Sequence, residues 1–230
     1  MHNVRVRNLG RPAPASAALR ATALLLAGAL ALSGCGSSEK KKPKADPSPT
    51  QPTSTVEVPS GVTLTEPGTD LKFGETATVA YEPNAQRNSV LELTVRSAQQ
   101  GRITDLGSYQ LDARTKASTP YYVRVGVKNV GTGDVGGSPV PLWAVDNTNT
   151  LIQASSFTNA FRKCPSTPLP ASFGANAAVE ACLVYLVPNH GTLTGVSFRP
   201  LQALAPILWT GTITPPPAIK KPTKKKRKAS

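Results

Sequence analysis

Histidine is almost missing from this 230-residue chain, which has two, and only His190 lies beyond the first few residues. A Ser-His-Asp or Cys-His catalytic arrangement would have to use His190, yet the sequence contains no Gly-x-Ser-x-Gly nucleophile elbow to accompany it. His190 stands in a Pro-Asn-His-Gly turn, where an imidazole is usually solvated and idle. The sequence therefore argues against an enzyme, and a hydrolase is kept only as the weakest alternative.

Other catalytic patterns are missing as well. The run from Gly131 to Gly136 has the spacing Gly-x-Gly-x-x-Gly of dinucleotide-binding loops, but it follows a predicted strand and no helical pattern comes after it. Asp105 and Asp112 flank a Gly-Ser-Tyr sequence that reads as the tip of a hairpin rather than as a catalytic carboxylate pair. We expect no catalytic residue and no cofactor.

No apolar run reaches the ~20 residues that a membrane-spanning helix needs. Residues 21–32 are twelve positions of Ala, Leu, Thr and Gly without a charge, and four arginines precede them. A basic stretch followed by a short hydrophobic segment is typical of a secretory signal peptide. We therefore predict that residues 1–34 are a targeting segment.

The residues at the end of this segment, Leu32-Ser33-Gly34-Cys35, resemble the lipobox of bacterial lipoproteins. In that family the cysteine thiol receives a diacylglycerol group and the peptide is cut just before it. Each buried methylene contributes ~0.8 kcal/mol, so two or more acyl chains give a durable anchor. The resemblance implies that Cys35 holds the protein at the extracellular face of the cell membrane. An ordinary signal peptide followed by a free Cys35 is the alternative.

Cysteine is also scarce, with three in the chain. If Cys35 carries lipid, Cys164 and Cys182 remain as a pair in an oxidising compartment, where disulfides form. They are 18 positions apart, and closing such a loop stabilises a protein by ~3 kcal/mol in the chain-entropy model. Two cysteines without a nearby histidine or clustered carboxylates are too few ligands for a metal ion. We predict a Cys164–Cys182 disulfide and no metal site.

The net charge of +13 is distributed unevenly. Residues 55–219 contain 11 basic and 11 acidic residues, whereas the C-terminal segment is strongly basic. Its cations are Lys220, Lys221, Lys224, Lys225, Lys226, Arg227 and Lys228. Near an anionic bilayer each such residue contributes ~1 kcal/mol, attenuated within a Debye length. We expect this tail either to contact anionic lipid or wall polymer or to be simply solvated, and nucleic acid is not an expected partner.

Composition divides the chain after the targeting segment into three parts. Residues 35–60 are rich in Ser, Lys, Pro and Thr, which is typical of a disordered spacer. Residues 61–215 contain nearly all the aromatic and branched side chains and are long enough for one domain with its own core. Residues 216–230 form the basic tail, which we expect to be disordered.

Apolar residues in the domain alternate with polar ones at a period of two, which predicts half-buried strands. Such segments lie at 77–81, 91–95, 121–127 and 207–213. Residues 179–187 are apolar almost throughout, which favours a central strand buried on both faces over a helix starting near Ala175. No segment has a sustained helical period. The pattern predicts an all-β, antiparallel two-sheet sandwich of about seven to nine strands.

Several short motifs occur in an order that resembles the telokin-like, immunoglobulin-like domains of Gram-positive lipoproteins and secreted mycobacterial antigens. They are Phe73-Gly74-Glu75, a valine-rich strand ending at Asn129-Val130-Gly131, an Asp-Asn-Thr-Asn turn at 146–149, and Leu186-Val187-Pro188. The resemblance covers roughly residues 70–214 and implies an immunoglobulin-like fold and a cell-surface setting. The Cys164–Cys182 pair departs from the family pattern. The resemblance implies no particular reaction.

The segment 153–176 is long for a connection in a sandwich, and long loops are often functional. It carries Phe157, Phe161 and Phe173, and Arg162 lies beside the second of these rings. Rigid aromatic anchors suit a binding surface, and the alternative is that the rings fold back and extend the core. We expect a non-catalytic binding or scaffolding module for an unknown envelope protein or ligand. A small-ligand receptor using this loop is one alternative, and an envelope hydrolase is the other.

Overall fold

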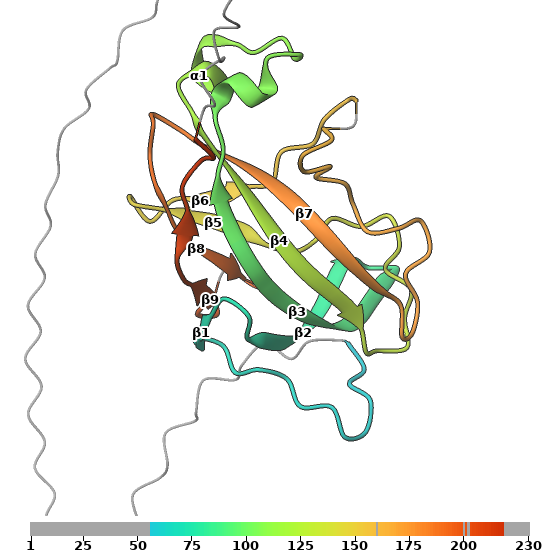
Figure 1. The fold of residues 1–230 in the computed structure, drawn as a ribbon. Coiled ribbons are helices and arrows are strands. Elements are labelled where there is room, and N and C mark those ends of the chain that lie inside the picture. Colours follow the sequence, from blue (N-terminus) through green and yellow to red (C-terminus); the bar gives the residue numbers. More distant parts are fainter. Residues whose placement is uncertain (1–55, 160, 200, 202, 219–230) are drawn as a thin grey trace, which may run out of the picture. The chain divides into compact units, whose positions relative to one another are not determined.

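The segments with alternating apolar residues form the centre of two β-sheets in the computed structural model, which describes residues 56–159, 161–199, 201 and 203–218 (Figure 1). Sheet A contains, in spatial order, β1 (Asp70–Lys72), β9 (Ile207–Thr210), β8 (Leu193–Phe198), β5 (Trp143–Asp146) and β6 (Leu151–Gln153). Sheet B contains β10 (Ile213–Thr214), β3 (Arg87–Gln100), β4 (Thr119–Asn129) and β7 (Ala178–Val187), and β2 (Thr76–Asn84) pairs with β3. The predicted all-β sandwich is confirmed, with ten strands among the described residues.

The period of two places every second residue of a strand in the core. In β4, Tyr121, Val123 and Val125 are buried, whereas Arg124 and Lys128 on the opposite face are exposed. The main core joins these side chains to residues of both sheets, among them Leu93, Leu183, Phe198 and Trp209. Burying one such side chain contributes about 1.5–3 kcal/mol, so this shared core holds the two sheets together.

β7 is a strand, as predicted, and no helix begins near Ala175. The prediction of a central position is wrong, because β7 lies at the end of its sheet and pairs in register only with β4. Its inner residues Leu183 and Tyr185 face the main core, while Cys182 and Val184 on the outer face belong to a second, smaller core. The continuous apolar run therefore reflects two cores and not two neighbouring strands.

The apolar residues at 207–213 belong to two strands and not to one. Trp209 lies in β9 of sheet A, and Ile213 lies in β10 of sheet B. β9 pairs with β1 in parallel, and β10 pairs with β3 in parallel, so these two short pairings depart from the predicted antiparallel pattern. Gly211 permits the change of sheet, since a Cβ there would lie 2.4 Å from the ring of Phe73.

The connection between β3 and β4 is not the simple hairpin tip that the sequence predicted. It contains a 3₁₀ helix, η1 (Ile103–Leu106), and one turn of α-helix, α1 (Ala113–Lys116). Asp112 caps α1, because its carboxylate accepts a hydrogen bond from the Thr115 N–H at 2.7 Å. Among the residues that the structure describes, none of the helices is long and apolar enough to cross a membrane.

The glycine run from Gly131 to Gly136 has a packing role. A Cβ at Gly133 would lie 1.9 Å from the carbonyl oxygen of Asn88, and one at Gly136 would lie 2.3 Å from the carbonyl oxygen of Ala171. No helix follows the run, so the dinucleotide-binding context is not present in this part of the domain.

Several predictions concern residues outside the described ranges. Lipidation of Cys35, the targeting segment and the cations from Lys220 to Lys228 all fall there and stay predictions. Residues 56–60, which the sequence assigned to the spacer, are described, and the Val56 side chain is 7% exposed. The packed part of the chain thus includes residues before position 61.

Candidate binding site between the sheets

Phe173 lies in the main core and is 1% exposed, so it is no part of a binding surface. Its backbone N–H donates to Asp134 Oδ1 at 2.9 Å, and its carbonyl oxygen accepts from Asn129 Nδ2 at 2.7 Å. These two bonds fix the end of the 153–176 loop just before β7. The prediction of Phe173 as a binding residue is therefore corrected: the ring folds back and extends the core.

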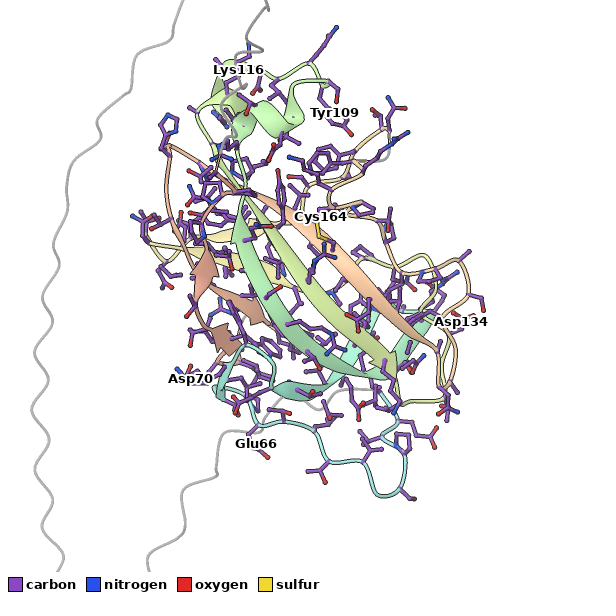
Figure 2. The ribbon with its side chains drawn as sticks, viewed as in Figure 1. Glu66, Asp70, Tyr109, Lys116, Asp134 and Cys164 are labelled. Carbon is purple, nitrogen blue, oxygen red and sulfur yellow. A yellow bond between two sulfur atoms is a disulfide. The ribbon has the colours of Figure 1, made fainter. Side chains whose placement is uncertain are left out.

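Phe157 and Phe161 pack on the outer face of sheet B together with Tyr109 and Tyr122, and we call these four residues the outer aromatic cluster. The Phe157 and Phe161 ring centroids are 5.5 Å apart, and Phe161 lies 5.6 Å from Tyr122. Figure 2 shows Tyr109 on the connection between β3 and β4, on the same side of the domain as the loop that carries Cys164. Phe161 is 6% exposed. Phe161 is thus packed in the second core, whereas Phe157 is half-buried and its role in binding stays a prediction.

Asp105 connects β4 to the 153–176 loop through its contacts with Tyr122 and Lys163. Its carboxylate accepts hydrogen bonds from the Tyr122 hydroxyl at 3.0 Å and from the Arg102 N–H at 3.1 Å, and it pairs with the Lys163 ammonium. Partial burial acts to raise the pKa of Asp105, but the hydrogen bonds and the Lys163 charge outweigh burial and hold the pKa below its usual value. Burial, and secondarily the Asp105 carboxylate, raises the pKa of Tyr122. Both groups are structural in this arrangement.

The predicted disulfide between Cys164 and Cys182 is present and ties the loop to β7. Two residues further on, Ser166 makes three more connections to neighbouring backbone. Its N–H donates to the Cys182 carbonyl oxygen at 2.9 Å, its hydroxyl donates to the Ser155 carbonyl oxygen at 2.5 Å, and the same hydroxyl accepts from the Val184 N–H at 3.0 Å. The loop is thereby held close to the strand. Arg162 is exposed, and its role in binding stays a prediction.

Two stretches of the same loop, residues 154–156 and 166–168, line a large cavity of about 1140 Å³. Its walls come from β2 and β7 of sheet B, from all of sheet A except β1, from the segments 64–67 and 139–142, and from Arg199, Leu201, Leu204 and Ala205. The loop contributes six residues besides the end of β6: Ala154, Ser155, Ser156, Ser166, Thr167 and Pro168. Ligand-binding cavities commonly measure ~300–1,000 Å³. This cavity can hold a molecule of substantial size.

The inner wall of the cavity is apolar. Val79, Leu142, Leu183, Phe198 and Ile207 line it and also belong to the main core, so the cavity reaches between the two sheets. Leu201, at 44% exposure one of two large apolar side chains that are well exposed in the described part of the domain, lies on the same lining. An apolar ligand can therefore pack against Leu201 at the surface, above core residues that are each at most 3% exposed.

Few charged groups line the cavity, and they are Arg199, Glu66 and Glu82. The Arg199 Nε atom is buried and has no hydrogen-bond partner among the described residues. Tyr81 also lines the cavity, and its hydroxyl donates to the Pro139 carbonyl oxygen at 2.7 Å. Burial raises the pKa of Tyr81 to about 12, so the phenol is neutral at physiological pH.

Sequence reasoning missed Arg199 and the cavity around it. Arg199 directly follows Phe198, the last residue of β8, and no motif or periodicity distinguishes it from other cations. The cavity is assembled from segments that are far apart in the sequence, so only the pairing of the strands reveals it. Small residues of the 153–176 loop line the cavity, whereas Phe157, Phe161 and Phe173, which the sequence singled out, do not.

His190 is exposed in the turn between β7 and β8. Its backbone N–H donates to the Ala117 carbonyl oxygen at 2.7 Å. Within the described ranges, no three residues of the His, Cys, Asp and Glu types come together in a way that could hold a metal ion. The geometry around His190 offers no support for a hydrolytic reaction.

No protein-family model matches the chain, and no curated protein matches its sequence significantly. Among solved structures, the chain is similar to MPT63, described as a secreted protein from Mycobacterium tuberculosis, with 13% sequence identity and a TM-score of 0.43. The alignment covers 62% of this chain and 96% of MPT63. A likeness at this identity and TM-score carries no argument about family, ligand or activity. Lipid attachment at Cys35 stays a prediction.

Proposed function

We propose that the domain is a non-catalytic binding module that holds a small, elongated, apolar ligand in the cavity between its sheets. The observation that carries this proposal is the cavity itself, with a volume of about 1140 Å³ and an inner wall made of core residues. A bound apolar molecule would cover exposed apolar surface of the lining, such as Leu201, and stabilise the domain.

We further propose that the module works at the extracellular face of the cell membrane, attached through lipidated Cys35. The lipobox-like residues before Cys35 and the Cys164–Cys182 disulfide support this setting, since structural disulfides belong to oxidising compartments. A module tethered in this way would share its compartment with membrane lipids, which are a source of apolar molecules. We propose no reaction for the domain.

The proposal is tested by titrating the purified full-length protein with the neutral fluorescent probe N-phenyl-1-naphthylamine. We expect saturable binding with one site per chain. Ala80→Phe and Ala154→Phe each place a ring on the lining and should weaken binding at least tenfold. Ala113→Phe, on the exposed side of α1, is the matched control and should leave binding unchanged.

Thermal unfolding of each variant shows whether it still folds cooperatively, so loss of binding can be separated from loss of structure. Two outcomes would contradict the proposal. One is the absence of saturable binding to the unmodified protein. The other is equal affinity in the unmodified protein and in folded Ala80→Phe and Ala154→Phe variants.

A further inference from the structure

We propose that the ligand is a single-chain amphiphile with an anionic headgroup, and that Arg199 binds this headgroup at the mouth of the cavity. This inference rests on the proposed function, because it names the chemical class of the molecule that the cavity holds. Arg199 is the one cation among the described residues of the lining, which otherwise consists of apolar, small polar and acidic side chains.

The hydrogen bonding of Arg199 is incomplete. Its Nε atom is shielded from solvent, and no described residue accepts a hydrogen bond from it. A buried guanidinium N–H without an acceptor is unfavourable, because it has lost water and gained nothing in exchange. Carboxylate and phosphate oxygens are the acceptors that match a guanidinium best. The unsatisfied donor therefore points to an anionic group that the domain itself does not supply.

Two other cations of the domain have carboxylate partners within it. Arg96 pairs with Glu180 at 2.5 Å, and Lys128 pairs with Glu92 at 3.7 Å, although these side chains are largely exposed. Arg199 is partly buried, whereas Arg96 is exposed. The shielded Nε–H of Arg199, beside an apolar cavity, is available to an incoming anion.

The distribution of polarity along the cavity fits an amphiphile better than a purely apolar molecule. Phe198 and Leu183 belong to the core, whereas Leu201 is exposed and lies two positions after Arg199. A hydrocarbon chain can therefore pack toward the core while its headgroup stays near Arg199 and Leu201. Arg199 is the cation that the described lining offers to an anionic headgroup.

The experiment compares palmitate with 1-hexadecanol, which has the same chain length and a neutral headgroup. Each is titrated into the full-length protein loaded with N-phenyl-1-naphthylamine, and displacement of the probe gives the affinity. We expect palmitate to bind more tightly than hexadecanol. Arg199→Gln should weaken palmitate binding about tenfold or more, because a hydrogen-bonded charge pair is lost. The same substitution should leave hexadecanol within about twofold, as expected for an unchanged hydrocarbon site.

Two further variants sharpen the test. Arg199→Lys keeps the charge and should retain part of the preference for palmitate. Arg124→Gln removes an exposed arginine from β4, outside the cavity, and should change neither affinity. Titration of hexadecyl phosphate separates the two anionic headgroups, and a preference for either one over hexadecanol that depends on Arg199 supports the inference.

The outcomes separate this inference from the proposed function. If the unmodified protein binds palmitate and hexadecanol equally and Arg199→Gln changes neither, the headgroup role is overturned while the apolar site stands. If neither ligand displaces the probe and the probe itself does not bind, the proposed function fails. If a folded Arg199→Gln variant loses both ligands, Arg199 only shapes the cavity and the inference is again overturned. Native mass spectrometry that finds a polypeptide or a second copy filling the cavity would overturn it too.

Discussion

The side chain of Asn129 shows how one residue can join distant parts of the chain. It is 0% exposed, and its amide is fully used. Oδ1 accepts from the Ser89 hydroxyl at 2.7 Å and from the Gly131 N–H at 3.0 Å. Nδ2 donates to the carbonyl oxygens of Gly133 at 2.8 Å and Phe173 at 2.7 Å. The end of β4, the glycine run and the end of the 153–176 loop are thus connected through one buried group.

Replacing Asn129 with alanine should destabilise the domain by about 3 kcal/mol, because buried partners of the amide lose their hydrogen bonds together. Chemical denaturation of the two proteins measures the change. Asn147→Ala is the matched control, since the exposed Asn147 side chain accepts from the Thr192 N–H, and its loss should cost less than ~1 kcal/mol. Equal effects of the two substitutions would show that the buried network contributes nothing special.

Residue-level function was the hardest to predict from the sequence. Asn129 was recognised only as the end of a strand, because its partners Ser89 and Phe173 are distant in the chain. Arg199 had no signal at all, since its distinguishing property is a missing hydrogen-bond acceptor. The cysteines were an exception. Their chemistry and number limit the pairings, so the Cys164–Cys182 disulfide could be predicted and is present.

At the scale of secondary structure, the long strands β2, β3 and β4 were predictable from their period of two, since one face of each packs in the core. Short strands were not. β1, β6 and β10 contain two or three residues each, too few for a pattern, and two of them pair in parallel with distant segments. The position of β7 was misjudged because its second face is covered by a second core, most of whose rings come from the connections that carry Tyr109, Phe157 and Phe161.

The disulfide between Cys164 and Cys182 should contribute to the stability of the domain. Changing both Cys164 and Cys182 to serine should lower the free energy of unfolding by about 3 kcal/mol, because the unfolded chain regains the freedom that the cross-link removes. Urea denaturation measures the difference. Reduction of the unmodified protein with dithiothreitol should give a similar loss. A change below ~1 kcal/mol in both experiments would show that the Ser166 contacts and the outer aromatic cluster hold the loop by themselves.

At the scale of the whole chain, charge is segregated: residues 55–219 carry equal numbers of basic and acidic groups, while seven cations crowd the C-terminal segment. We propose that this segment makes a second, salt-sensitive contact with anionic lipid or wall polymer. Cys35→Ala protein on cells should then be released by rising salt, since the contacts are screened within a Debye length. The same protein without residues 218–230 should be released at lower salt. Identical release of the two would contradict the proposal.

The attachment of the loop to β7 has a consequence for solubility. β7 ends its sheet, so its outward N–H and C=O groups form a row that an incoming strand from another molecule could join. Ser155 and Ser166 already occupy that row at Val184 and Cys182, and the disulfide keeps them there. The cross-linked segment therefore satisfies hydrogen bonds at this edge of β7 as a neighbouring strand would, and it hinders the addition of a strand from another copy. We expect a chain without this cross-link to expose Val184 and Cys182 at the edge of β7, and therefore to self-associate more readily.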